Sequence, residues 1–129
     1  MSKFADTNNK IIKMGIDEVR DLCMGMTGVT EDMPYGPDVV TFRIEGKIFA
    51  MIGLERLPAT IAVKLTPERN DELREQYDTV KPAYHCNKRH WSDIEIESHS
   101  GKDVAKWIRE AYDLVISGLP KSLRMKYER

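Results

Sequence analysis

The densest group of residues capable of chemistry is the segment TVKPAYHCNKRHWS at residues 79–92, which contains no Asp or Glu. Its Lys and Arg side chains can pair with phosphates, and its Tyr and Trp rings can lie flat against a sugar or a base. Its histidines add charge only near pH 6. The residues that we expect to contact double-stranded DNA are Lys81, His85, Lys88, Arg89 and His90. The alternative is an ordinary solvated loop beside a tryptophan of the core.

All three histidines of the chain fall between residues 85 and 99, with Cys86 among them. Zinc binds His and Cys, but His85 and Cys86 would point to opposite faces of a strand, and there is no second cysteine pair. Cys86 next to His85 is also the weakest form of a Cys/His nucleophile. We therefore interpret Cys86 as a buried structural thiol and predict no metal site and no cofactor. Ligation by His85, Cys86, His90 and His99 remains an open alternative.

Three carboxylates follow the basic segment at alternate positions, Asp93, Glu95 and Glu97. On a strand they would line one face while Ile94 and Ile96 fill the other. Such a row attracts Ca²⁺ or Mg²⁺, but neighbouring Cβ atoms on one strand face are ~7 Å apart and do not close a coordination shell. We interpret the row as a solvated face.

The chain carries no GxSxG, P-loop, GxGxxG or HExxH motif, so we expect no catalysis. Its 20 Lys and Arg balance 21 Asp and Glu to a net charge of −1. This balance excludes a polycation that holds nucleic acid by bulk charge, and equally an acidic tail protein. Residues 123–129 form a basic tail that either helps to hold a polyanion or keeps the chain end soluble.

The length of 129 residues and the 41% of apolar residues suit one α+β domain, which we place at residues 14–122. Residues 1–13 are polar, and we expect them to be loosely ordered. The N-terminus has no apolar export signal, and the longest apolar run, Ile48 to Leu54, is too short to cross a bilayer. The two cysteines lie far apart in sequence, which favours reduced thiols in a cytoplasmic protein.

The hydrophobic patterning predicts the element order α-β-β-β-α-β-β-α, with an antiparallel sheet because neighbouring strands follow each other as hairpins. The expected helices span residues 17–26, with Asp17 as N-cap, 66–76, with Thr66 as N-cap, and 103–117. The expected strands span residues 40–44, 48–52, 61–65, 84–86 and 91–96, and residues 30–38 are expected to form turns.

The arrangement of the last two strands places the basic residues. We expect Arg89 to be exposed at the turn between them, with Trp91 turned inward to pack under the last helix. His90 then faces outward with the charges or stands at the strand entrance.

Four stretches of the chain resemble the MmcQ/YjbR family of small bacterial proteins. They are GVTE followed by the YGPD turn at residues 28–38, VTFRIEGKIFA at 40–50, KRHW at 88–91 and EAYDLVISGLP at 110–120. Together they span roughly residues 16–122. The resemblance implies an α+β double-wing or CyaY-like fold, similar to secretion-chaperone folds, and a DNA-binding role.

Two hypotheses of function follow. The first is a DNA-binding module that reads no sequence and contacts duplex phosphates through the basic hairpin. The second is a protein-interaction domain without catalysis that uses its open sheet or an apolar, methionine-rich patch. The sequence leaves the identity of the partner and the oligomeric state open.

Overall fold

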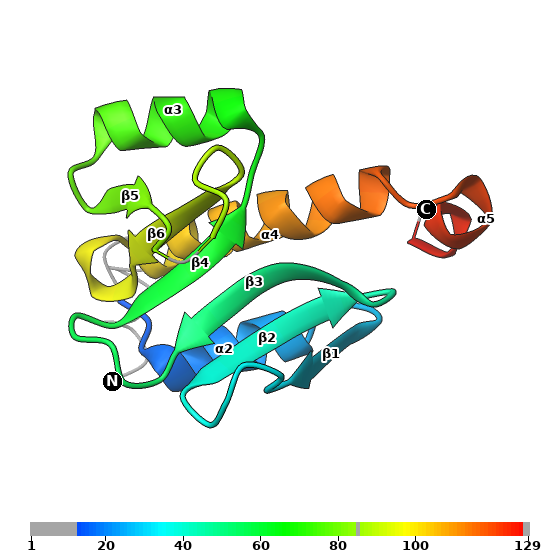
Figure 1. The fold of residues 1–129 in the computed structure, drawn as a ribbon, viewed down its shortest axis with the longest axis horizontal. Coiled ribbons are helices and arrows are strands. Elements are labelled where there is room, and N and C mark those ends of the chain that lie inside the picture. The colour runs from blue at the N-terminus through cyan, green and yellow to red at the C-terminus, as the bar shows by residue number, and fades with distance from the viewer. Residues whose placement is uncertain (1–12, 85, 128–129) are drawn as a thin grey trace, which may run out of the picture.

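The computed structural model describes residues 13–84 and 86–127. One six-stranded antiparallel sheet organises them, in the order β1-β2-β3-β4-β6-β5 (Figure 1). The strands are β1 Val29–Asp32, β2 Val39–Ile44, β3 Lys47–Gly53, β4 Thr60–Lys64, β5 Val80–Pro82 and β6 Trp91–Glu95. The α+β class and the antiparallel pairing expected from the sequence are confirmed.

The helices cover one face of the sheet and leave the other open. They are α2 Ile16–Met24, α3 Pro67–Gln76, α4 Gly101–Ser117 and the short α5 Lys121–Arg124, with single 3-10 turns η2 Ile96–Ser98 and η3 Met125–Tyr127. In Figure 1, α2 and α4 lie behind the sheet and α3 lies above it, beside β5. Among the described residues, no helix is long and apolar enough to cross a membrane.

Strand alternation places the large apolar side chains on the covered face. Phe42 and Ile61 are fully buried there, and so is Phe49, which lies at the register shift between β2 and β3. Trp107 of α4 is buried against the same face. The ring of Phe49 meets Tyr112 of α4 edge to face, with centroids 5.6 Å apart. The core therefore lies between the sheet and α4, and the opposite sheet face is left for contact with solvent or a ligand.

Helix capping follows the expected chemistry at one helix and departs from it at another. The Thr66 hydroxyl accepts from the backbone N–H of Arg69 at 3.2 Å, as predicted for the start of α3. The prediction of Asp17 as N-cap of the first helix is wrong. Gly15 is the cap, and the Glu18 carboxylate accepts its backbone N–H at 2.9 Å.

Two short edge strands differ from the expectation. The turn expected at residues 30–38 begins with β1, whose polar residues pair in register with β2, as Glu31 does with Phe42. The strand expected at 84–86 is wrong, because β5 ends at Pro82 and Tyr84 lies in a turn. That turn forms because the Ala83 N–H donates to the Trp91 carbonyl at 3.1 Å, which closes the chain back onto β6.

The expectation that Trp91 packs under the last helix is also wrong. Trp91 lies opposite Lys64, and Asp93 lies opposite Ala62, so these residues project from the open face. Ile94 has the opposite parity and is fully buried on the covered face. The tryptophan that is buried against the covered face of the sheet is Trp107 of α4.

Candidate functional site

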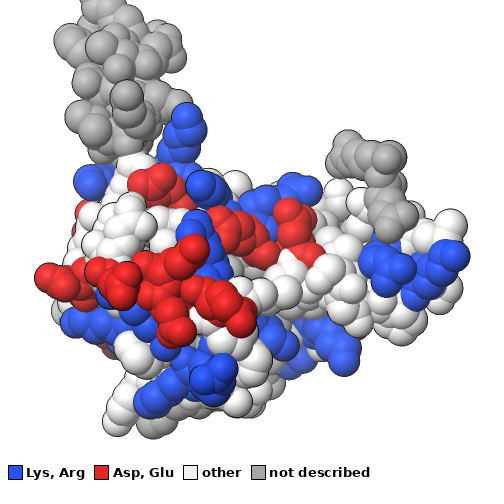
Figure 2. All heavy atoms as spheres, turned by 90° about the horizontal axis from the view of Figure 1, so that it is seen from above, with Lys and Arg blue, Asp and Glu red and all other residues white. Residues whose placement is uncertain are grey.

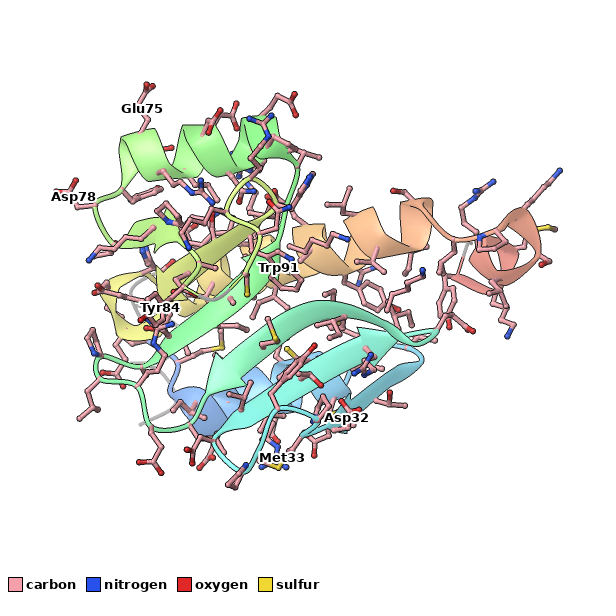
Figure 3. All side chains as sticks on the ribbon, in the orientation of Figure 1. Asp32, Met33, Glu75, Asp78, Tyr84 and Trp91 are labelled. Carbon is pink, nitrogen blue, oxygen red and sulfur yellow. The ribbon has the colours of Figure 1, made fainter. Side chains whose placement is uncertain are left out.

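A groove runs across the open face of the sheet, with a volume of about 590 Å³. We call it the open-face groove. Its floor comes from Val39 of β2, Ile48, Met51 and Gly53 of β3, Thr60 and Ala62 of β4 and Asp93 of β6. Its sides come from Tyr35, Arg56, Tyr84, Cys86, Asn87 and Trp91. Figure 3 shows Tyr84 and Trp91 on the side of the sheet away from α4.

Loops from opposite ends of the sheet meet in this groove at one carboxylate. Arg56, in the β3–β4 loop, donates from Nη1 to Asp93 Oδ2 at 2.8 Å. The backbone N–H of Tyr84, in the β5–β6 loop, donates to the same oxygen at 3.3 Å. Asp93 is buried, so the sequence interpretation of a solvated carboxylate is wrong at this position. Buried carboxylates are retained when charged donors satisfy them, and Arg56 supplies that charge.

Because Gly53 has no side chain, it leaves space for the Arg56 side chain to reach Asp93. A Cβ added at Gly53 would lie 2.8 Å from both Cγ and Cδ of Arg56, so the arginine stem lies flat on this position. The small side chain of Ala62 then separates β3 from Asp93 on β6. The sequence held one indirect sign of this arrangement, a glycine at the end of an otherwise apolar strand.

The other two carboxylates of the acidic row, Glu95 and Glu97, lie on different elements. Glu95 lies on β6 as expected, and Lys81 Nζ approaches its carboxylate to 3.9 Å. Glu97 lies in the 3-10 turn η2 and is exposed, so the expected run of three on one strand face stops at two. Among residues 13–84 and 86–127, no group of three or more His, Cys, Asp or Glu is placed to hold a metal ion.

Cys86 lies at the side of the groove and is partly exposed rather than fully buried. Burial raises the pKa of its thiol, and the Asp93 carboxylate raises it further. The thiol therefore stays protonated at neutral pH, which disfavours a nucleophilic role. His99, one of the four residues of the alternative zinc site, lies between Tyr77 and Trp107, with ring centroids 5.0 and 4.9 Å away.

The residues expected to contact DNA reach different positions. Lys88, Arg89 and His90 lie together in an exposed turn before β6. Lys88 Nζ folds back to donate to the Ala83 carbonyl at 3.3 Å, and Lys81 faces Glu95 as described. His85 lies outside the described residues. The exposure predicted for Arg89 is confirmed, and binding of DNA by these residues stays a prediction.

Two residues of α3 that sequence reasoning missed hold this turn in place. Arg74 Nη2 donates to the carbonyls of Lys88 at 2.6 Å and Trp91 at 2.7 Å. The buried Asn70 donates from Nδ2 to the Arg89 carbonyl at 2.8 Å, and its Oδ1 accepts the Ser92 hydroxyl at 2.6 Å. Burial lowers the pKa of Arg74. The available sign was a lone Asn among the charges of a surface helix.

The surface around the turn has mixed charge. Figure 2, seen from above, shows Asp and Glu side chains gathered over the part of the surface that α3 forms. The exposed acids of this segment are Glu68, Asp71, Glu72, Glu75 and Asp78. They stand beside the basic turn because Arg74 of the same helix binds it. A phosphate backbone approaching the turn would meet this negative charge.

Part of the basic tail also has partners within the fold. Lys126 Nζ lies 3.5 Å from the Glu45 carboxylate, and the Tyr127 hydroxyl donates to the same group. This hydrogen bond lowers the pKa of Glu45 and raises that of Tyr127 to about 12. The tail through residue 127 thus folds back onto the β2–β3 turn.

Comparison with known proteins agrees with the fold and leaves the chemistry open. A family model described as YjbR matches residues 24–114. The uncharacterised protein YjbR of Escherichia coli K12 is 28% identical over 113 residues, covering 86% of this chain and 95% of its own length. The uncharacterised protein YbdF of Escherichia coli O157:H7 is 32% identical over 93 residues, covering 68% of this chain and 73% of its own.

Solved structures share the architecture. Deinococcus radiodurans protein DR2400 superimposes with a TM-score of 0.81 at 24% identity, over 90% of this chain and 88% of its own. A Pseudomonas syringae protein superimposes with a TM-score of 0.69 at 25% identity, over 78% of this chain and 98% of its own.

Proposed function

This chain belongs to the YjbR family, and from that premise we propose that it is a non-catalytic module that binds a partner protein on the open face of its sheet. The observation that carries the proposal is the open-face groove, a mostly apolar depression with the three aromatic rings of Tyr35, Tyr84 and Trp91 at its sides. Its volume of about 590 Å³ lies in the range of known ligand pockets.

The residue types in the groove support a protein partner. Tyr, Trp, Met and Arg are the residues enriched in protein interfaces, and Trp, Tyr and Arg supply most of the energetic hot spots. Here they are Tyr35, Tyr84, Trp91, Met51 and Arg56. They come from five segments of the chain and converge on one face.

The loops around the groove add exposed apolar surface. Met33 and Tyr35 lie in the β1–β2 loop, Leu54 and Leu57 in the β3–β4 loop, and Tyr84 in the β5–β6 loop; all five are exposed, Leu57 to 94%. Each of these loops also contributes a side chain to the groove. Of the five, Tyr35 and Tyr84 line the groove itself. Apolar residues gathered at one depression are typical of interaction surfaces.

Duplex DNA is the second candidate, and the exposed turn at Lys88, Arg89 and His90 favours it. The acids of α3 beside this turn, and the Ala83 carbonyl that holds Lys88, favour the protein partner.

The test is capture from native lysate with the tagged protein, with and without nuclease. The proposal expects a discrete protein that survives nuclease and is lost with Tyr84→Ser or Trp91→Ala. Met125→Ser is the matched control, because Met125 is an exposed apolar residue of η3 away from the groove. Loss of the captured protein after nuclease would instead support the DNA candidate. If Met125→Ser lost the partner as the groove variants do, the groove would not be the binding site.

A further inference from the structure

We propose that the open-face groove takes an acidic, apolar segment of the partner protein, with one carboxylate on Arg56 and one large apolar side chain beside Trp91 and Tyr84. This inference rests on the proposed function above and adds the chemistry of the partner.

The described residues that line the groove include one cation, Arg56, and one anion, Asp93, and the two differ in their exposure to a ligand. The Asp93 side chain is only 9% exposed, and its Oδ2 already accepts from Arg56 and from the Tyr84 N–H. The Arg56 side chain is 47% exposed. A ligand entering the groove therefore meets a guanidinium, so the accessible charge calls for an anion.

Arg56 is held ready for such a ligand. Its stem lies on Gly53, which leaves no room for a Cβ, and Asp93 holds its Nη1. Within residues 13–84 and 86–127 the structure gives this side chain one hydrogen bond, while a guanidinium has five N–H donors in a planar fork. A carboxylate fits that fork geometry, and a side chain already fixed in place loses less entropy on binding.

The rest of the groove suits an apolar side chain next to that carboxylate. Met51 and Ala62 are cross-strand neighbours on the floor, and Ala62 is next to Asp93 in register. Trp91 and Tyr84 stand at the sides of the same depression. The pattern of one guanidinium beside an aromatic-sided apolar floor matches a segment in which Asp or Glu neighbours a large apolar residue.

A single carboxylate fits better than a chain of phosphates, because Arg56 is the one cation among the described residues that line the groove. Arg43 Nε lies 3.1 Å from an Asp32 carboxylate oxygen, and Lys81 lies 3.9 Å from Glu95. A single-stranded nucleic acid needs a row of accessible cations beside the stacking rings.

The experiment selects 12-residue peptides from a random display library on the full protein. The enriched peptides are then synthesised with a fluorescein label, and each is also made with Asn or Gln in place of its Asp or Glu. Their affinities are measured for the wild type, Arg56→Gln, Gly53→Val and Trp91→Ala. The second variant keeps the guanidinium but pushes its stem away. Arg20→Gln is the matched control, because its side chain is 46% exposed and also binds a carboxylate, that of Glu31, away from the groove.

The proposal expects enriched peptides with an acid next to an aromatic or large aliphatic residue. Loss of the acid should weaken binding to wild type by about 10-fold or more, as for a charged hydrogen bond, and should not weaken binding to Arg56→Gln. Gly53→Val should behave like Arg56→Gln, and Arg20→Gln like wild type. Circular dichroism melting of each variant shows that it is folded.

The failures are distinguishable. Enriched peptides that carry no acid, or that bind Arg56→Gln as tightly as wild type, would overturn the assigned chemistry and leave a protein-binding groove. The absence of any enriched peptide that depends on Trp91 would overturn the proposed function too. Displacement of the peptides by a 12-nucleotide oligo-dT would assign the anion to a phosphate and overturn the protein partner.

Discussion

The orientation of the two tryptophans can be tested by truncating each one. Trp107 of α4 is 3% exposed, so Trp107→Ala removes nearly all of the 150–250 Å² that an aromatic residue buries. At ~25 cal/mol per Å² this corresponds to about 4–6 kcal/mol, close to the ~3–5 kcal/mol typical of such truncations. Trp91 is partly exposed on the opposite face, so we expect Trp91→Ala to cost about 1–2 kcal/mol.

Urea denaturation followed by far-UV circular dichroism measures both values in one assay. Unchanged slopes with different midpoints would show that only stability has changed. The chain has two tryptophans, so each variant keeps the other as a fluorescence probe. If Trp91→Ala costs as much as Trp107→Ala, then Trp91 is a core residue, the facing of β6 is wrong by one residue, and the open-face groove does not exist as described.

Three further predictions concern the supports of the site. Asn70→Ala should cost about 2–3 kcal/mol in urea denaturation, because it leaves buried partners unsatisfied, and a cost under about 0.5 kcal/mol would contradict its role in holding the turn. Burial holds the pKa of His99 below its usual 6.5, so the unfolded chain takes up this proton first as pH falls. The stability that neutral His99 contributes is thus present above pH 6.5 and is lost as pH falls toward the lower pKa of the folded state. In melting scans across this pH range, His99→Gln should lose less stability than the wild type. An equal loss in both proteins would refute the role of buried His99. Reversing both charges of the exposed turn, Lys88→Glu with Arg89→Glu, should leave the melting temperature and partner capture nearly unchanged; failed capture by the folded variant would move the binding surface to the turn.

Local patterns were enough to predict the central strands and the helices α2, α3 and α4. Val40, Phe42 and Ile44 alternate with polar residues, and all three are buried in β2 as that alternation requires. Thr66 followed by Pro67 starts α3 at the predicted residue. In each case the signal is a local pattern, an alternation along one strand or a cap followed by proline, so a short stretch of sequence is enough to show it.

The edge strand β1 escaped prediction because polar contacts hold it rather than an apolar pattern. Glu31 binds Arg20 of α2 through two hydrogen bonds, and Asp32 binds Arg43 of β2. An edge strand exposes polar residues and depends on such partners. Since the partners lie eleven residues away, the pattern within β1 itself does not show them.

The open-face groove escaped prediction for a related reason. Asp93 is buried because Arg56 reaches it from 37 residues away, and this pairing depends on the register of three strands. The basic segment could be read from the sequence, but the α3 residues that fix its turn and surround it with acids could not. Composition near Trp91 therefore predicted the basic segment, whereas the groove that we propose as the binding face depends on contacts that the local sequence does not show.

The most direct test of the partner-binding face is photocrosslinking in native cells, with Tyr84 replaced by p-benzoylphenylalanine. Tyr84 is 70% exposed at the side of the open-face groove, and Met125, 58% exposed on η3, is the control position for the same replacement. The account predicts a discrete, nuclease-resistant crosslinked protein from position 84 and none of that species from position 125. Crosslinking to nucleic acid alone at position 84, or the same protein from both positions, would contradict it.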